Sequence, residues 1–190
     1  LDQIRQALGY AVKRVRQAKS GAFAVALPSS VPHGASPIDV GQTMTEGAIL
    51  GSYQFTTYRS DAPTGKGVTA MTVLAPQKDH LRQLSEGIRR GVATAEATVY
   101  VRDLCNHPSN VMTPTRIASE AKTVAKEVGV NLKILEQKEM EQLGMGAILA
   151  VAKGSHEAPN CIILQYHGAK NKNDRPVVLV GKTITFDTGG

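Results

Sequence analysis

The sequence is poor in the residues that define several protein classes. It has no tryptophan and only 4% aromatic residues, so we do not expect the stacking platforms with which proteins read single-stranded nucleic acid. Its two cysteines, Cys105 and Cys161, cannot build the disulfide framework of a small secreted protein. The longest apolar runs, Ala147–Ala152 and Val177–Val180, are far shorter than the ~18 residues of a membrane-spanning helix. With no basic and apolar leader either, these absences favour a cytoplasmic protein without a membrane segment.

What remains is an ordinary globular composition with a basic balance. The 190 residues are 42% hydrophobic and 20% charged, which suits one large domain or two small ones. Lysine and arginine number 22 against 16 aspartate and glutamate. The only local concentration is a basic face on the first segment, made by Arg5, Lys13, Arg14, Arg16 and Lys19. Such a face is usually only solvated, but it leaves open a contact with nucleic acid or protein.

The first part of the chain alternates between helical and strand patterns. Apolar residues at three- and four-residue steps predict helices, and short β-branched runs between turn residues predict strands. We expect helices at 2–20 and 39–55, strands at 22–27 and 68–74, and loops at 28–37 and 56–67. The first 77 residues therefore predict a small α/β domain.

A single long helix is expected to follow. Apolar positions recur at helical spacing from Leu81 to Val99 within a helix that runs from about Lys78 to Asn106. This exceeds the ~8–20 residues of most globular helices. A helix that links two domains explains the length, so we predict a small domain at 1–77, a linking helix at 78–105 and a second domain at 106–190.

The second domain also has an α/β pattern. Thr113 before Pro114 is typical of a helix start, and Gly129 of its end. Further elements are expected as a short helix at 137–143 and strands at 130–135, 147–152, 161–166 and 177–186. Helices and strands interleaved in this way predict an α/β domain with a largely covered sheet.

Several standard motifs are excluded by their context. Gly181-Lys182-Thr183 looks like the end of a phosphate-binding loop, but Pro176 stands where that loop needs glycine. There is neither a Gly-x-Ser-x-Gly elbow nor a His-Glu-x-x-His zinc helix. The five histidines lack ligand-like spacing.

The segment from Val177 to Gly190 stands apart chemically. An apolar strand is expected to carry Lys182 and Asp187 near its end and to finish in Gly189-Gly190. Buried charges are costly unless they are paired or bind a metal, and ligand sites often form at strand ends in α/β sheets. A plain ion pair or solvent exposure is the alternative reading for either residue alone.

Taken together, the string Gly181-Lys182-x-Ile184-Thr185-Phe186-Asp187-Thr188-Gly189-Gly190 resembles the signature of the leucyl aminopeptidase family, also called cytosol aminopeptidases. The stretches at 106–114, 143–145 and 150–155 agree with that family in order and spacing. The resemblance is strong from about Val101 onward. It is looser before that, where Glu46–Gly51 is similar to the family's N-terminal domain.

The resemblance implies a hydrolase, a metalloprotease that removes N-terminal amino acids such as leucine from peptides at a two-metal centre. It implies a homohexamer and two divalent ions, Mn²⁺ or Zn²⁺, with Mg²⁺ as a third candidate. By position, Lys182 would ligate one ion and Asp187 would bridge both. A lysine can do so only as the neutral amine, so neighbouring dications and burial must remove its proton.

The resemblance also places the catalytic residues and the remaining ligands after Gly190. The chain is therefore expected to be an interior portion of such an enzyme: the remainder of an N-terminal domain, a linking helix, and the first part of an α/β catalytic domain with a mixed sheet. A pair of ligands cannot complete a two-metal site, so the 190 residues alone are expected to be inactive.

One position departs from the family pattern. Thr183 stands where the family usually has glycine, and period-2 alternation sends Lys182 and Asp187 to opposite faces of a strand. Both can reach one metal cluster only if the backbone is irregular within Thr183–Asp187.

The alternative function is a non-catalytic binding module whose basic helix contacts nucleic acid or protein.

Overall fold

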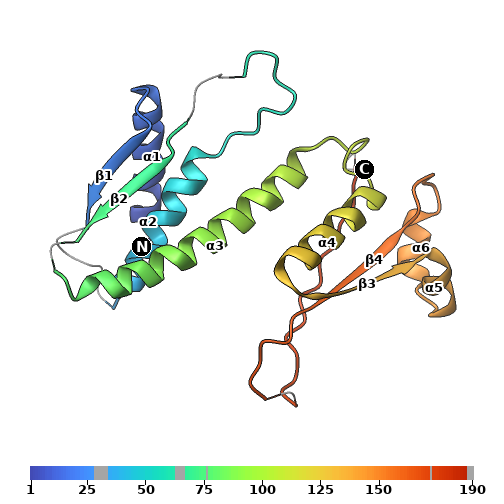
Figure 1. The fold of residues 1–190 in the computed structure, drawn as a ribbon. Coiled ribbons are helices and arrows are strands. Elements are labelled where there is room, and N and C mark those ends of the chain that lie inside the picture. The colour runs from blue at the N-terminus through green and yellow to red at the C-terminus, as the bar shows by residue number, and fades with distance from the viewer. Residues whose placement is uncertain (28–33, 63–66, 76, 172, 188–190) are drawn as a thin grey trace. The chain divides into compact units, whose positions relative to one another are not determined.

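A computed structural model describes residues 1–27, 34–62, 67–75, 77–171 and 173–187 (Figure 1). The chain divides into two compact units, Leu1–Asn106 and His107–Gly190, each with its own two-stranded sheet. The predicted α/β class is confirmed. Parts of the loops expected at 28–37 and 56–67 lie outside the described residues. Within the described ranges, no helix is long and apolar enough to cross a membrane.

The first unit packs three helices with a parallel pair of strands. Its elements are α1 (Asp2–Gln17), β1 (Ala22–Ala26), α2 (Pro37–Ser52), β2 (Ala70–Leu74) and α3 (His80–Asn106), close to the expected ranges. Figure 1 shows β1 and β2 side by side, and their register runs from Ala22 opposite Ala70 to Ala26 opposite Leu74. Alternate strand residues, Phe23 among them, pack on a core that includes Val40 and Met44.

Local chemistry fixes the start of α2. The Asp39 amide donates to the Ser36 hydroxyl at 3.2 Å, and the Ser36 amide donates to the Asp39 carboxylate at 2.8 Å. This capping box satisfies two backbone donors that the first turn leaves without helical partners, and Pro37 has no amide hydrogen that would need an acceptor. The Ser36 hydroxyl also donates to the Asp39 carboxylate at 2.7 Å. The hydrogen bonds that the Ser36 amide and then the Ser36 hydroxyl donate to this carboxylate lower the pKa of Asp39.

Glycines let α2 approach its neighbours backbone to backbone. A Cβ at Gly91 on α3 would lie 2.6 Å from the Gln42 carbonyl oxygen and 2.7 Å from the Thr45 Cβ. A Cβ at Gly87 would meet the Ile38 carbonyl directly. No side chain fits at these crossings, so the contact between α2 and α3 requires glycine.

Glu46 joins the three helices of the first unit through hydrogen bonds. Its side chain is only 12% exposed. Arg5 of α1 donates twice to one carboxylate oxygen, at 3.0 and 2.9 Å, while Thr94 of α3 and Gln42 donate to the other at 2.9 and 2.8 Å. Burial by itself raises the pKa of Glu46, but the hydrogen bonds from Gln42, Arg5 and Thr94 outweigh it, and the pKa is lowered.

The second unit places an antiparallel strand pair among shorter helices. Its elements are α4 (Pro114–Val128), β3 (Asn131–Glu136), α5 (Gln137–Gln142), α6 (Gly146–Ala152) and β4 (Asn160–Gln165). The pairing runs from Asn131 opposite Gln165 to Glu136 opposite Asn160. The predicted ends of α4 are confirmed. The Thr113 hydroxyl accepts a hydrogen bond from the Arg116 amide at 3.3 Å, and Gly129 ends the helix with φ +70°.

One predicted strand is wrong in type. Residues 147–152 lie in α6, which is helical from Gly146 to Ala152. A short apolar run without alternation does not separate a buried strand from a helix. Three alanines and a leucine in this run have high helix propensity, which favours the observed state.

The strand predicted at 177–186 is also wrong. The backbone of 176–187 has no regular secondary structure, and the side chains of Val177–Val180 are 72–93% exposed. The sequence pattern is that of a buried strand, but a strand needs a neighbour for its backbone hydrogen bonds. Among the described residues of this unit, β3 and β4 pair only with each other.

We expect Gly91→Ala to destabilise the first unit by about 1–3 kcal/mol, because the new methyl group meets the backbone of α2. Gly9→Ala is the matched control, since its Cβ would lie 3.6 Å from the nearest atom, an ordinary contact. Urea unfolding followed by circular dichroism measures both. Equal effects of the two substitutions would contradict the close approach of α2 and α3.

We expect Glu46→Gln to lower the free energy of unfolding by about 1–3 kcal/mol near neutral pH. The substitution weakens the hydrogen bonds that Arg5, Gln42 and Thr94 donate to a mostly buried carboxylate. The folded pKa lies below the ordinary value of 4.5. The stabilising contribution is therefore present above pH 4.5 and is lost as the pH falls through the lower folded pKa. Urea titrations between pH 3 and 7 should show the difference from wild type shrinking on the acid side.

The exposed Glu96 of α3 provides the control for this measurement. Glu96→Gln should leave the free energy of unfolding within about 0.5 kcal/mol of wild type across the same pH range. A loss that is as large for Glu96→Gln as for Glu46→Gln would show that Glu46 has no special role.

Candidate functional site

Lys182 and Asp187 lie in one exposed segment near the end of the chain. Neither belongs to a helix or strand, and both side chains are exposed. The chain bends at Thr185, inside the interval where irregular backbone is expected, although the irregularity extends over the whole of 176–187. The sequence argument that these charges are buried in an apolar strand is therefore wrong. Residues 188–190, which include the glycine pair, lie outside the described residues.

The donor set around these two residues fits a divalent metal only in part. A carboxylate such as that of Asp187 suits Mn²⁺, Zn²⁺ or Mg²⁺, and a lysine nitrogen can serve as a ligand when neutral. Across the described part of the chain, however, no three His, Cys, Asp or Glu side chains come together as a metal-binding group. This segment therefore offers two of the expected ligands and no closed metal centre.

The second unit also carries a shallow hollow of about 530 Å³. It contains residues from the stretch at 150–155 on which part of the family resemblance rests, and its polar wall includes Glu141, Lys153, Ser155, His156 and Glu157. The Ser155 hydroxyl accepts a hydrogen bond from the Glu157 amide at 3.0 Å, and the Thr115 hydroxyl donates one to the Glu157 carboxylate at 3.1 Å. The serine and the glutamate thus make local structural contacts, and neither Lys182 nor Asp187 lines the hollow.

A polar cluster at the end of the first unit was not anticipated from the sequence. The Tyr53 hydroxyl donates to Asp103 at 2.8 Å and accepts from Asn106 at 2.9 Å, while the Arg102 guanidinium carbon lies 5.6 Å from the Tyr53 ring centroid. Burial, followed by the hydrogen bond to Asp103, raises the pKa of the phenol above 10.0. The cluster fixes the chain after α2 to the last turns of α3. No local pattern reveals a pairing of residues fifty positions apart.

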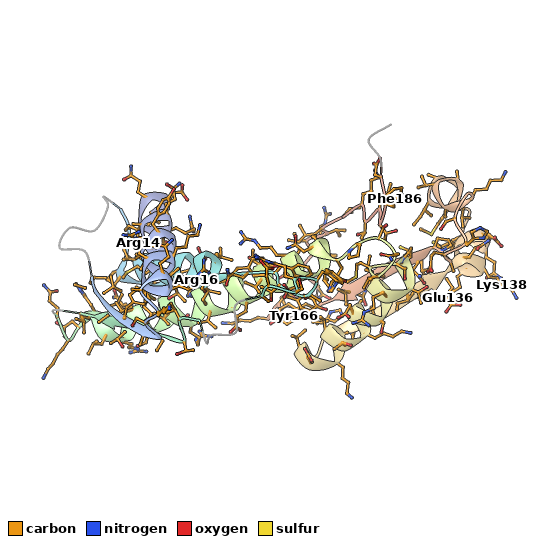
Figure 2. The ribbon with its side chains drawn as sticks, turned by 90° about the horizontal axis from the view of Figure 1, so that it is seen from above. Arg14, Arg16, Glu136, Lys138, Tyr166 and Phe186 are labelled. Carbon is orange, nitrogen blue, oxygen red and sulfur yellow. The ribbon has the colours of Figure 1, made fainter. Side chains whose placement is uncertain are left out.

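The basic face of α1 is smaller than the sequence suggests. Arg5 is paired with Asp2 and Glu46, which removes it from the free positive charge. Arg14 and Arg16, labelled in Figure 2, lie in the last turn of α1, where positive charge complements the helix dipole. The Lys13 ammonium lies 5.9 Å from the Tyr10 ring centroid. Lys13 and Arg14 are exposed, so positive charge remains on this face beyond Arg5.

Comparisons with curated proteins give relatives along the whole chain. A "Probable cytosol aminopeptidase" of Alkaliphilus oremlandii is 39% identical over 191 residues, which cover 100% of this chain and 38% of the relative. A protein of the same description from Aquifex aeolicus is 38% identical over 189 residues, covering 100% of this chain and 36% of the relative. The chain thus spans little more than a third of the length of the curated relatives it matches.

Solved structures share the fold. The bottromycin maturation enzyme BotP in complex with Mn has a TM-score of 0.72 at 27% identity, over 86% of this chain and 33% of that one. A mutant of tomato leucine aminopeptidase has a TM-score of 0.75 at 24% identity, over 84% of this chain and 32% of that one, which shows likeness of fold alone.

Two family models match in tandem. The N-terminal domain of the cytosol aminopeptidase family matches residues 1–62. The catalytic domain of the same family matches residues 99–190, a range that includes Lys182 and Asp187. Domain order, relatives along the whole chain and shared fold agree with the resemblance seen in the sequence, and the chain belongs to the cytosol aminopeptidase (leucyl aminopeptidase) family.

Proposed function

We propose that these residues form part of a metal-dependent aminopeptidase that releases N-terminal amino acids, leucine among them, from peptides. The observation that carries the proposal is the tandem match to the N-terminal and catalytic domains of one aminopeptidase family. Relatives aligned to the whole chain carry the same description. Because the chain spans little more than a third of them, the activity is assigned to a protein that contains these residues together with further ligands.

Lys182 and Asp187 are the proposed metal ligands of this chain. A carboxylate has two oxygens and can bridge two ions, whereas a neutral lysine amine offers one nitrogen to one ion. When bound, a pair of divalent ions would supply an activated water and polarise the scissile carbonyl. Manganese is supported by the Mn complex of BotP, and zinc and magnesium suit the same donors.

The exposed position of both ligands sets a requirement for the rest of the protein. Side chains bind a metal ion tightly only when packing and hydrogen bonds hold them in the correct orientation. In this chain, residues 176–187 have no strand neighbour among the described residues. Further ligands, and the groups that act on substrate, are therefore assigned to residues after Gly190. The 190 residues alone should not turn over substrate.

The same proposal includes domain organisation and assembly. We assign residues 1–77 to the N-terminal domain, 78–105 to a linking helix and 106–190 to the catalytic domain. The division of the chain between Asn106 and His107 supports the start of the catalytic domain, and it places the linking helix within the first unit. We further infer that the protein is cytoplasmic and acts on peptides with a free N-terminus, in keeping with the description of the relatives as cytosol aminopeptidases. A homohexamer is inferred from the family resemblance alone.

The alternative, a non-catalytic module that binds nucleic acid or protein through α1, has less support, because Arg5 is already paired within the first unit. The two functions differ in their response to salt. Binding driven by phosphate contacts weakens steeply as salt rises. Peptidase activity should instead depend on the added metal.

The test begins with the protein purified from its source, whose intact mass is compared with the 20.2 kDa of this sequence. We expect a larger mass and hydrolysis of leucine p-nitroanilide that is lost with a chelator and restored by Mn²⁺ or Zn²⁺. In that protein, Asp187→Asn should lower kcat/KM by about 100-fold or more, because it removes the negative charge of the carboxylate that would hold the metal ions.

Asp174→Asn is the matched control, since Asp174 is another exposed aspartate of the same unit and lies outside the proposed site. It should leave kcat/KM unchanged. Hydrolysis that persists in a chelator, or equal effects of the two substitutions, would contradict the metal roles. Turnover by the isolated 190-residue chain would contradict the placement of further ligands after Gly190.

A further inference from the structure

The hollow of about 530 Å³ in the second unit is built from one short stretch of the chain. All of its lining residues in the described part of the chain lie between Gln137 and Pro159. They belong to α5, to α6, which Figure 1 shows next to α5, and to the loop after α6. The stretch therefore forms the hollow by itself. Its volume lies within the ~300–1,000 Å³ of small-molecule sites.

Hydrogen bonds hold the loop that forms one wall of the hollow. The Glu157 carboxylate accepts from the Thr115 hydroxyl of α4 at 3.1 Å, and the Glu157 amide donates to the Ser155 hydroxyl at 3.0 Å. At the start of β4, the Asn160 side chain donates to the Ala158 carbonyl at 3.1 Å. These bonds connect the loop to both α4 and β4. A wall that is held before the ligand arrives lowers the entropic cost of binding.

Two opposite charges on the lining have no ionic partner. Glu141 of α5 accepts one hydrogen bond, from the neutral amide of Gln137 at 2.9 Å, and forms no ion pair among the described residues. Lys153, directly after α6, donates no side-chain hydrogen bond and forms no ion pair in the described part of the chain. A carboxylate and an ammonium group that line one hollow are complementary to a ligand that carries both charges.

Apolar side chains line the same hollow. Leu149, Ala152 and Pro159 are half-buried there, so an apolar group of a ligand would cover surface that water now contacts. We propose that the hollow binds a free apolar α-amino acid, with its ammonium group on Glu141 and its carboxylate on Lys153. An amino acid is also a product of the proposed hydrolysis, but this assignment rests on the hollow alone and requires neither metal nor activity.

Titration calorimetry of the full-length protein with L-leucine tests the proposal, in a chelator that removes metal ions. We expect saturable binding with a dissociation constant on the order of 1 mM, as for a small ligand in an open site. Lys153→Gln should raise this constant about threefold to tenfold, because it removes an ion pair with the ligand carboxylate. Lys170→Gln is the matched control, since Lys170 is an exposed lysine of the same unit outside the hollow, and it should leave the constant unchanged.

Two analogues of leucine test each charge separately. Leucinamide lacks the carboxylate and 4-methylpentanoate lacks the amine, so both should bind the wild type more weakly than leucine does. Lys153→Gln should weaken binding of leucine and 4-methylpentanoate but not of leucinamide. Glu141→Gln should weaken binding of leucine and leucinamide but not of 4-methylpentanoate. This pairing of each substitution with one ligand group is not expected from a general loss of structure.

Three outcomes would overturn the amino-acid site. They are no saturable binding of leucine by the wild type, equal weakening by Lys153→Gln and Lys170→Gln, and equal losses for all three ligands. Binding that occurs with metal but disappears in the chelator would assign leucine to the metal centre and would also overturn the site. The proposed function fails on different evidence, namely hydrolysis that does not need metal, so the two failures are distinguishable.

Discussion

Backbone atoms of α2 lie directly against those of α1 and α3, and this close approach is the constraint on which the first unit depends. Glycines permit it, because a methyl group at Gly47 or Gly87 would overlap a carbonyl of the neighbouring helix. The same approach brings Arg5 and Thr94 within hydrogen-bonding distance of Glu46. A carboxylate that is only 12% exposed needs these donors, so packing and polar satisfaction stabilise each other.

The second unit lacks a comparable constraint at its end. The β3–β4 pair has apolar residues on both faces, because Leu132 and Ile134 lie on one face of β3 and Leu135 lies on the other. Strands with this pattern usually lie inside a larger, covered sheet. Residues 177–187 have the composition to extend that sheet but lie exposed. A strand partner that these residues acquired would also hold Lys182 and Asp187, so under the proposed metal roles sheet pairing would position the ligands.

Much of the fold follows from local signals in the sequence. The Thr113-Pro114 start and Gly129 end of α4 were predictable, because caps depend on residues within one turn. The long α3 follows from sustained helical spacing. The strands predicted at 147–152 and 177–186 were wrong, because a short apolar run signals burial without specifying secondary structure and because a strand exists only where a neighbour pairs with it.

For the candidate site, the sequence by itself determined the family and the two candidate ligands, since a ten-residue string with a lysine and an aspartate five positions apart is chemically unusual. Only the tertiary structure decided which charges are engaged. Glu46 and Tyr53 found partners across 41 and 50 residues, while Lys182 and Asp187 stayed on an exposed segment. The physical reason is that hydrogen bonds and burial depend on distances between elements, which no local pattern encodes.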